Sequence, residues 1–436
     1  MTKVYKDSNI EWIGDIPREW KTTKLFNLCT IKGRIGWNGL RSDEFKEKSF
    51  AYLVTGQDFV SSDINWDRCY QIDKDRYDED PFIQLSNGDI LITKDGTIGK
   101  IAKVRNMDKP ACLNSGIFVL KQRKETFDQN YLYWYLVSPI LLAYNAYINS
   151  GGTTIMHLYQ NVFERFPLLI PPISDQHKIA DYLDSKCKEI DSLINLQEQM
   201  IAQLTDYKQS VISEAVTKGL NPNAELVSSG IEWIGAVPKK WSINKVNRLF
   251  GLIGSGTTPN TSDDDAFVGS INWLQSGDIN GGIITNASKK ISNDTLVKYS
   301  VLSVYKAPFI IVAMYGASVG NISISHIDAC VNQACCVLSD SKIDFTYAFY
   351  AIKSAQRYLI FRAVGGGQPN ISQYTLRQLW IPEPPLAEQR AIASYLDSKC
   401  NEIDSLIELK QQKIESLKDY KKSVIFEAVT GKTSIE

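Results

Sequence analysis

Histidine is scarce in this chain, and several features of common enzyme and scaffold classes are missing. The three histidines, His157, His177 and His326, leave few candidates for histidine-based catalysis. None of the eight cysteines belongs to a Cys-x-x-Cys pair or lies at ligand spacing from a histidine, which predicts buried thiols in a reducing compartment. The first residues contain no apolar run typical of a signal peptide, so we expect a cytoplasmic protein.

An excess of charge of one sign is also missing. The 48 Lys and Arg nearly balance the 49 Asp and Glu, for a formal net charge of -1, which excludes polybasic arms and acidic tails. A hydrophobic content of 44% in 436 residues is ample for two or three globular domains. The chain is therefore not expected to bind a polyanion through bulk charge alone.

Motifs for nucleotides and methyl donors are absent as well. The sequence GKT near the C-terminus resembles the end of a phosphate-binding loop, but Phe426 stands where the first glycine is required. The glycines at 251–256 lack the strand, helix and distant acid of a dinucleotide site, and no Asn/Asp-Pro-Pro-aromatic motif for amino methylation is present. We therefore expect no catalytic residue, cofactor or metal in this chain.

The sequence contains an internal repeat. Residues 171–217 return without a gap at 384–430, with about two-thirds of the positions identical, and IEWIGDIPREW near the N-terminus returns as IEWIGAVPKKW. The segments between these blocks are weaker relatives of each other. The chain therefore reads as variable, constant, variable, constant, which indicates a tandem duplication.

Each constant block predicts one long helix. Apolar residues recur every seven positions, and a helix of roughly 40 residues would span about 60 Å, too long to bury its apolar stripe on one small domain. Ser174 is a candidate first-helix N-cap, and Gly219 and Gly431 are candidate stops. Two separate core helices are the alternative to a coiled coil. The apolar seam residues are Leu183, Ile190, Ile194, Ile201 and Leu204, then Leu396, Ile403, Ile407, Ile414 and Leu417.

The variable segments predict mixed α and β structure. Residues 86–104 and their counterparts alternate β-forming residues with turn residues, which predicts a hairpin with glycines at its bend. Residues 131–148 are apolar enough to suggest a membrane span, but their repeat partner carries Lys353 and Arg357. A buried or amphipathic helix is the better interpretation.

Several loops combine Arg, Lys, Asn, Gln, Ser or Thr with glycine, the residue types that read base edges at close range. Two related domains on a rigid spacer suit two short sites on one extended ligand such as double-stranded DNA. An ordinary solvated turn is the alternative for each loop, and a helix cap from Asn370 to Gln373 for the last. The candidates are Lys32, Arg34, Trp37, Asn38 and Arg41; Lys94, Thr97 and Lys100; Ser255, Thr257, Thr258 and Asn260; and Gln368 and Asn370.

These motifs together resemble the specificity subunit of type I restriction-modification enzymes over nearly the whole chain. The resemblance rests on the paired EWIGxxPxxW entries, KGRIGWNGL, GSGTTPN, INWLQSGDI, GQPNIS and the two PPxxxQxxIxxYLD helices. It implies an α+β fold in which two pseudo-twofold-related target recognition domains are joined by two long conserved helices in an antiparallel coiled coil. Gln275 and Ser276 of INWLQSGDI join the candidate DNA contacts.

The resemblance also implies boundaries and partners. It assigns residues 1–170 to target recognition domain 1, 171–220 to a central conserved helical region, 221–383 to target recognition domain 2 and 384–436 to a distal conserved helical region. Each domain would read one half of a bipartite target. Two methyltransferase subunits with S-adenosylmethionine would methylate adenine, and two restriction subunits with ATP and magnesium would translocate and cleave DNA.

Two other functional classes are compatible with the sequence, and one motif departs from the pattern of the family. A scaffold whose coiled coil drives oligomerisation, or a nuclease or methyltransferase acting alone, would belong to other functional classes. The first repeat has TTIMHL where the second has GQPNIS, so the two half-site contacts are expected to differ. The near-neutral charge predicts weak, salt-sensitive DNA binding by the chain alone.

Overall fold

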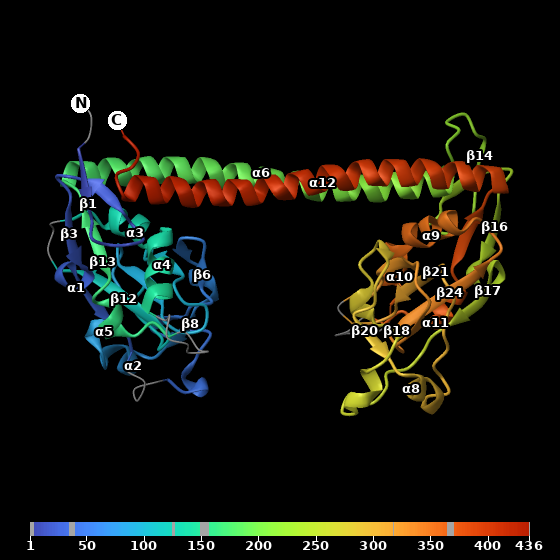
Figure 1. The fold of residues 1–436 in the computed structure, drawn as a ribbon, viewed down its shortest axis with the longest axis horizontal. Helices are drawn as coiled ribbons and strands as arrows, with labels where there is room; N and C mark the ends of the chain where they lie inside the picture. The colour runs from blue at the N-terminus through green and yellow to red at the C-terminus, as the bar shows by residue number, and fades with distance from the viewer. Residues whose placement is uncertain are drawn as a thin grey trace. The chain divides into compact units, whose positions relative to one another are not determined.

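The computed structural model describes residues 4–34, 40–123, 127–148, 157–316, 318–363 and 370–435. The chain divides into two compact units, coloured by residue number in Figure 1. Unit 1 comprises Met1–Gln197 with Gln412–Glu436, and unit 2 comprises Glu198–Gln411. The predicted regions 171–220 and 384–436 thus each contribute residues to both units.

Unit 1 is built on a four-stranded sheet in the order β10-β9-β12-β4 and a three-stranded sheet in the order β11-β5-β8. The pairs β1-β2, β3-β13 and β6-β7 complete it. Its strands are β1 (Tyr5–Asp7), β2 (Asp15–Pro17), β3 (Lys21–Lys24), β4 (Cys29–Lys32), β5 (Ala51–Val54), β6 (Phe59–Val60), β7 (Asp63–Ile64), β8 (Tyr70–Ile72), β9 (Ile90–Thr93), β10 (Ile101–Lys103), β11 (Ala111–Leu113), β12 (Ile117–Gln122) and β13 (Pro167–Ile170). Its short helices are α1 (Leu25–Leu28), α2 (Lys74–Asp78), α3 (Gln129–Val137), α4 (Pro139–Ile148) and α5 (Gln160–Phe163).

Unit 2 repeats this plan with a five-stranded sheet in the order β17-β24-β21-β22-β19 and a three-stranded sheet in the order β20-β18-β23. The pairs β14-β15 and β16-β25 correspond to β1-β2 and β3-β13. Its strands are β14 (Leu226–Ser228), β15 (Ala236–Pro238), β16 (Ser242–Lys245), β17 (Phe250–Gly254), β18 (Ile271–Leu274), β19 (Ile283–Ile284), β20 (Lys289–Ile291), β21 (Phe309–Ala313), β22 (Ile322–Ser325), β23 (Ala329–Val331), β24 (Cys335–Ser341) and β25 (Trp380–Glu383). Its short helices are α7 (Val246–Leu249), α8 (Asn293–Lys298), α9 (Phe345–Ser354), α10 (Gln356–Phe361) and α11 (Gln373–Arg377).

The predicted hairpins are confirmed in both units. Strands β9 and β10 pair antiparallel, as do β21 and β22. Gly96 and Gly99 in the first bend and Gly316 and Gly320 in the second have positive φ, a conformation that glycine adopts without the steric penalty of a side chain. The apolar run 131–148 is split into α3 and α4 at Ser138, before Pro139. Among the described residues, no helix is both long and apolar enough to cross a membrane.

The constant blocks form the two long helices α6 (Ile173–Lys218) and α12 (Leu386–Val429). In unit 1, the Tyr131 hydroxyl donates to the carbonyls of both Leu169, before α6, and Val429, at the end of α12. In unit 2, Trp241 Nε1 donates to Glu388 near the start of α12, and the same ring lies against Gly219 at the end of α6. Within each unit the two helices are therefore antiparallel, as predicted.

The predicted seam lies on the packed side of these helices. Six of its ten apolar residues are buried, and Ile194, Ile201, Leu204 and Ile407 are half-buried. Gly219 and Gly431 follow the helix ends with φ values of 75° and 72°, as expected for left-handed stops. The predicted cap at Ser174 is wrong, because α6 begins at Ile173 directly after the two prolines.

The same ion pair closes the seam in both units. Lys208 Nζ lies 2.6 Å from Asp404 Oδ2 in unit 2, and Lys421 Nζ lies 2.7 Å from Asp191 Oδ2 in unit 1. Each lysine side chain is less exposed than the aspartate it meets, 18% against 54% for Lys208 and 26% against 53% for Lys421. Because each lysine finds its acid only in one antiparallel register, the pairs select that register.

We expect Lys208→Asp to destabilise the chain, because two carboxylates would then face each other. The loss should be about 1 kcal/mol, since the aspartate partner is half exposed and solvent weakens the pair. The exchange Lys208→Asp with Asp404→Lys should recover most of it. Urea unfolding of the full chain measures both, and a double variant no more stable than the single one would contradict the register role.

Candidate nucleic-acid interface

In unit 1, three loops meet at one edge of the sheets. They are residues 55–58 after β5, the hairpin bend 94–100 after β9, and residues 114–116 after β11. Together they line a cavity of about 790 Å³. Its lining residues are mostly polar or glycine, with two aromatic side chains, and they are Phe45, Thr55, Gly56, Gln57, Tyr70, Thr93, Asp95, Gly96, Thr97, Lys100, Asn114 and Gly116.

The loop at 55–58, which we call capped loop 1, is held by a buried carboxylate. Asp58 Oδ2 accepts hydrogen bonds from the Thr55 backbone N–H at 2.7 Å and from Thr55 Oγ1 at 2.9 Å. Burial raises the pKa of Asp58, and these hydrogen bonds counter the rise. The Gln57 side chain is left exposed at the cavity. A rigid loop thus presents an amide that can donate and accept hydrogen bonds.

The hairpin bend is fixed in the same way. Thr93 Oγ1 donates to the Thr97 carbonyl at 2.5 Å and accepts from the Lys100 backbone N–H at 3.0 Å. Lys94 N–H donates to the Gly116 carbonyl, which joins the bend to the third loop. The Lys100 and Thr97 side chains remain exposed beside the cavity. Hydrogen bonds of the Asp58 and Thr93 side chains and of the backbone therefore hold these loops.

Unit 2 contains the same three loops. In capped loop 2, residues 275–278, Asp278 Oδ2 accepts from the Gln275 backbone N–H at 2.9 Å, as Asp58 does in unit 1. Asn332 N–H donates to the Leu274 carbonyl, and Met314 N–H donates to the Ala334 carbonyl. These bonds repeat those of Asn114 and Lys94 in unit 1. The backbone hydrogen bonds that join the loops are therefore repeated in unit 2, whereas the contacts of the Thr93 hydroxyl are not, because Ala313 stands in its place.

The predicted residues of unit 1 are only partly brought together. Thr97 and Lys100 line the cavity, and half-buried Lys94 lies 3.0 Å from Asp95 Oδ2. Lys32 ends β4 with Nζ 5.3 Å from the Phe82 ring centroid, and Arg41 is exposed. Predicted residues Trp37 and Asn38 lie outside the described residues.

Arg34 departs from its predicted exposed role. Its side chain is 4% exposed, and Nε donates to the Leu113 carbonyl at 3.0 Å. The guanidinium thus ties the chain after β4 to the end of β11, and in this arrangement it is not positioned to reach a base edge. The sequence suggested exposure because arginine next to glycines is typical of binding loops, whereas here the long side chain fills the interior.

We expect Arg34→Met to lower the free energy of unfolding by about 2 kcal/mol, because a buried carbonyl loses a charged hydrogen-bond donor. Thermal unfolding of the full chain measures the loss. Arg41→Met is the matched control, since Arg41 is exposed and should change stability by less than about 0.5 kcal/mol. Equal stability of the two variants would show that the Arg34 side chain does not stabilise the fold through Leu113, and Arg34 would again be a candidate DNA contact.

The predicted residues of unit 2 cluster more closely. Thr258 Oγ1 donates to Gln333 Oε1 at 2.6 Å, and Ser276 Oγ lies 3.9 Å from the position that a Cβ on Gly316 would take. Ser255 Oγ donates to the Cys335 carbonyl, and the Thr257 carbonyl accepts from Trp273 Nε1. The Gln275 backbone N–H donates to the capping Asp278, the Gln275 side-chain Nε2 donates to Ser288 Oγ at 3.3 Å, and Asn260 is exposed.

Of the last two predicted residues, Gln368 and Asn370, the structure describes only Asn370. Gln368 lies outside the described residues, and Asn370 is exposed. The predicted helix cap at Asn370 is wrong, because the N-cap of α11 is Ser372, whose side chain accepts from the Thr375 backbone N–H. The neighbouring Ile371 N–H donates to the Met314 carbonyl at 2.7 Å, so this segment borders the hairpin bend.

Sequence reasoning missed the amides and aromatics that the third loops and the cavity wall supply. Gln57, Tyr70 and Asn114 line the cavity of unit 1, and exposed Gln333 lies beside Thr258 in unit 2. The signal was the repeated pattern of an apolar strand followed by a polar residue at 114 and 332, which aligning the two halves exposes. No sequence pattern indicated Tyr70.

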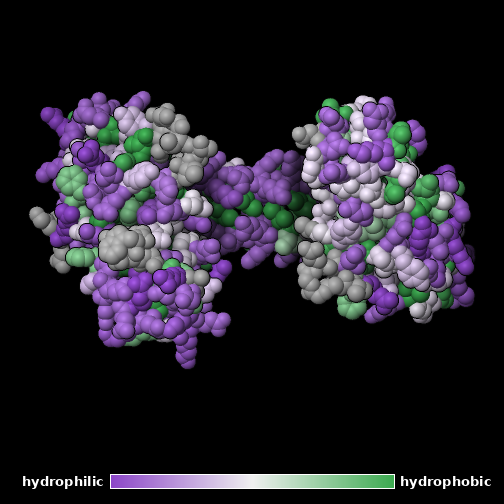
Figure 2. Space-filling view, turned by 90° about the horizontal axis from the view of Figure 1, so that it is seen from below, coloured by the Kyte–Doolittle hydropathy of each residue, from purple (hydrophilic) through white to green (hydrophobic). Residues whose placement is uncertain are grey.

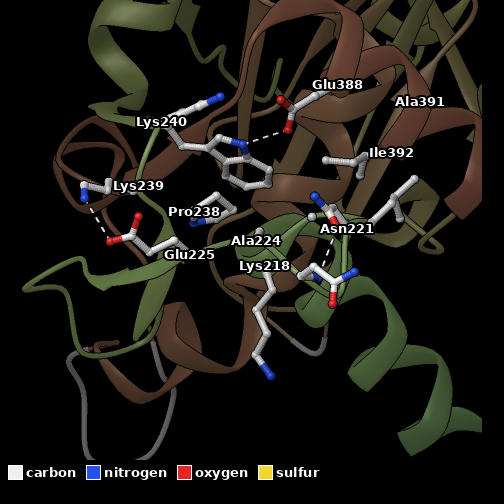
Figure 3. A pocket seen from close by; sticks show the side chains of 14 residues that line it. Lys218, Asn221, Ala224, Glu225, Pro238, Lys239, Lys240, Glu388, Ala391 and Ile392 are labelled. Carbon is white, nitrogen blue, oxygen red and sulfur yellow. Dashed lines mark hydrogen bonds and ion pairs between the residues drawn. The ribbon is translucent and has the colours of Figure 1, made fainter.

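A second pocket, of about 460 Å³, lies in unit 2 where α6 ends and α12 begins (Figure 3). In its lining, Trp241 Nε1 donates to Glu388 Oε2 at 2.9 Å. Lys239 pairs with Glu225 on the β14-β15 side. Its lining comes from the helix ends, the connection after α6 and the β14-β15 hairpin. Among the described residues, no three His, Cys, Asp or Glu side chains gather as a possible metal site.

One lysine side chain is buried in the structure described. It is Lys103 on β10 of unit 1, which is 4% exposed, donates to Asn130 Oδ1 at 2.8 Å and lies 4.2 Å from the Tyr133 ring centroid. Burial lowers the pKa of Lys103 to about 8, and the nearby carboxylates of Asp184, Asp128 and Asp63 oppose the shift while Arg105 adds to it. The unfolded chain holds the same proton up to about pH 10.5.

Stability should therefore depend on pH through Lys103. Below pH 8 both states hold the proton, and from pH 8 upward the folded state releases it first, so this residue's contribution to stability rises with pH. Relative to Lys103→Met, we expect the unaltered chain to gain about 1 kcal/mol between pH 7 and pH 9. Urea unfolding of both proteins at each pH gives the comparison, and a pH-independent difference would contradict the prediction.

Two α+β units with the same three loops, and two long helices that contribute to both, define a duplicated protein with two equivalent loop surfaces. A family model described as the type I restriction modification DNA specificity domain matches residues 17–205 and 238–419. The chain therefore belongs to this family of non-catalytic, DNA-recognition subunits of type I restriction-modification systems, which confirms the resemblance seen in the sequence.

Individual relatives agree with this assignment. A putative type I restriction enzyme MjaX specificity subunit of Methanocaldococcus jannaschii is 25% identical, over 100% of this chain and 99% of its own. The type I restriction enzyme EcoBI specificity subunit of Escherichia coli is 23% identical, over 75% of this chain and 70% of its own.

Solved structures share the fold. A chain from work on complex assembly and conformational transition of the type I R-M system has a TM-score of 0.72 at 16% identity, covering 96% of this chain and 99% of its own. The HsdS subunit from Thermoanaerobacter tengcongensis has a TM-score of 0.50 at 15% identity, covering 96% and 98%.

Proposed function

We propose that unit 1 and unit 2 each read one half of a bipartite double-stranded DNA target, through capped loops 1 and 2 and the loops beside them. The chain directs partner subunits in the cytoplasm, which methylate adenine within the target or restrict DNA that lacks the methyl group. The long helices set the separation of the two half-sites.

One observation carries this proposal: loops joined by the same backbone hydrogen bonds present different side chains in the two units. At equivalent framework positions, capped loop 1 has Gln57 where capped loop 2 has Gly277. The Lys100 carbonyl accepts from the Thr93 N–H in unit 1, and the Asn321 carbonyl accepts from the Ala313 N–H in unit 2. Lys100 therefore corresponds to Asn321. Base edges are distinguished by the donors and acceptors placed against them. A shared frame with different side chains is what reading two different half-sites requires.

The repeat also supports two copies of one partner. Leu193 and its counterpart Leu406 are each 41% exposed, and Leu196 and Leu409 are 49% and 59% exposed. Apolar side chains reach the surface of the long helices in Figure 2. Because each unit offers the same exposed residues, one kind of partner can bind twice, and we assign this role to two methyltransferase subunits. Two restriction subunits complete the restricting form.

The charge balance supports a dependence on those partners. Phosphate contacts dominate nucleic-acid affinity, and a chain with net charge -1 has no surplus of Lys and Arg to supply them. The partners would therefore provide much of the DNA clamp, together with S-adenosylmethionine, ATP and magnesium. The target adenine must also leave the base stack, which requires a pocket on the methyltransferase.

Methylation sequencing tests the proposal. The chain is co-expressed with its cognate methyltransferase subunit, and the methylated adenines define the target. Gln57→Ala should relax the target at a position within one half, and Gln275→Ala should do so within the other. Lys306→Met, an exposed lysine paired with Asp328, is the control and should leave both halves unchanged. A single undivided target, or relaxation of both halves by either variant, would refute it.

A further inference from the structure

Lys353 of helix α9 points its ammonium at a backbone carbonyl instead of a carboxylate. Nζ donates to the Gly281 carbonyl at 2.7 Å, and it lies 5.0 Å from the Phe349 ring centroid. The side chain is half-buried, and desolvation together with Lys208 lowers the pKa of Lys353 to about 8. Removing an ammonium from water costs free energy unless hydrogen bonds or charges compensate it. The contact with Gly281 is therefore expected to have a role in the structure.

The helix that carries Lys353 is fastened to both long helices of unit 2. The Tyr350 hydroxyl donates to Asp397 Oδ1 of α12 at 2.8 Å, and Gln209 Nε2 of α6 donates to the Ser354 carbonyl at 3.4 Å. At the start of α9, the Asp344 N–H donates to Gln389 Oε1 of α12 at 2.7 Å. Helix α9 is therefore anchored at both ends, and Lys353 projects from a fixed base.

The carbonyl that Lys353 binds belongs to the segment 279–282, which directly follows capped loop 2. Asn321 Nδ2 donates to the Ile279 carbonyl at 3.1 Å, and the Gly281 N–H donates to Ser323 Oγ at 3.0 Å. Both partners come from the hairpin of β21 and β22. Lys353 adds a contact from the helix side, so the segment is held between the hairpin and α9.

Among the residues that the structure describes, unit 1 has no counterpart of this contact. Asp128 caps α3 as Asp344 caps α9, and counting nine residues onward from each places Val137 at the position of Lys353. Ser61, with φ 55°, takes the place of Gly281, with φ 88°. Valine has no donor for the Ser61 carbonyl. The two units thus share the loop and differ in what supports it.

We propose that Lys353 is a positioning residue for base recognition by unit 2: its hydrogen bond to Gly281 fixes capped loop 2 relative to α9 and the long helices. Lys353 does not contact DNA itself. It acts through Gly281 on Gln275 and Ser276, and it affects only the half-site that unit 2 reads. This inference rests on the proposed function of the capped loops.

Hydrogen exchange on the full chain, without any partner, tests whether the Lys353 hydrogen bond fixes capped loop 2. In Lys353→Met, amides at 275–282 should exchange about 10-fold faster, because a charged hydrogen bond that closes the segment is lost. Amides at 55–62 in unit 1 should be unchanged, and Lys353→Arg, which keeps a donor, should restore most of the protection. Unchanged exchange at 275–282 in Lys353→Met would overturn the proposal.

Methylation sequencing with the cognate methyltransferase tests the consequence for recognition. Gln275→Ala first identifies the half-site read by unit 2. Lys353→Met should then reduce discrimination by about 10-fold at positions of that half, the scale of one base contact, while the other half serves as an internal reference. Lys239→Met, which removes an exposed lysine of the same unit, is the matched control.

The outcomes separate the two proposals. Full discrimination in Lys353→Met, or an equal loss at both halves, would overturn the positioning role and leave the proposed function intact, since a general loss of stability affects both halves. If the unaltered chain gave no bipartite target at all, the proposed function itself would fail. Relaxation of the unit 2 half alone, restored by Lys353→Arg, would support the positioning role.

Discussion

Inserting four residues into each long helix should move the preferred target to one with two more base pairs between its half-sites. The insertions belong after Gln197 in α6 and after Gln411 in α12, where both helices pass from one unit to the other. Four helical residues add about 6 Å, close to two base-pair steps of about 3.4 Å. Because each half-site depends on its own unit, the two half-site sequences themselves should not change.

The expected effect on the original target is large. Two recognition surfaces that no longer meet both half-sites lose the gain from simultaneous binding, which is commonly 100-fold or more, about 3 kcal/mol. Methylation sequencing reports the new spacing and the loss at the old one together. Substituting four exposed residues of the same helices without changing their length is the control. An unchanged spacing in a folded insertion variant would show that the helices do not set the separation.

Much of the fold follows from the sequence because it depends on repeated local patterns. The seven-residue apolar period identified α6 and α12, and glycines with positive φ marked the helix ends and hairpin bends. The ion pairs of Lys208 and Lys421 were not predicted, because a lysine at a seam position gives no indication of which acid it meets. Their partners lie 196 and 230 residues away in the chain.

The candidate site was harder to predict because exposure depends on tertiary packing. Arg34 and Gly256 are equivalent residues of the two units. Each lies two residues after the end of a strand, where Lys32 of β4 pairs with Val119 in unit 1 and Gly254 of β17 pairs with Val337 in unit 2. Both residues lie in glycine-containing loops that suggest a binding surface, yet Arg34 turns inward to the Leu113 carbonyl. The sequence indicated which loops matter and could not show which side chains face outward.

Gly256→Ala should destabilise unit 2 and abolish methylation of the bipartite target. A Cβ at this position would lie 1.8 Å from the Val331 carbonyl oxygen and 2.8 Å from its carbon, both backbone atoms at the end of β23. The backbone of residues 254–258 must therefore move away from β23. Overpacking of this kind costs about 3 kcal/mol, since no flexible side chain can make room.

The displacement also reaches the candidate contacts. Thr258 follows two residues later and would be drawn away from Gln333, which it now meets at 2.6 Å. Thermal unfolding and methylation sequencing measure the two effects. Gly277→Ala is the matched control for stability, because a Cβ there would meet no atom within 4 Å. Equal stability of the two alanine variants would mean that the close approach of residue 256 to Val331 does not constrain the loop.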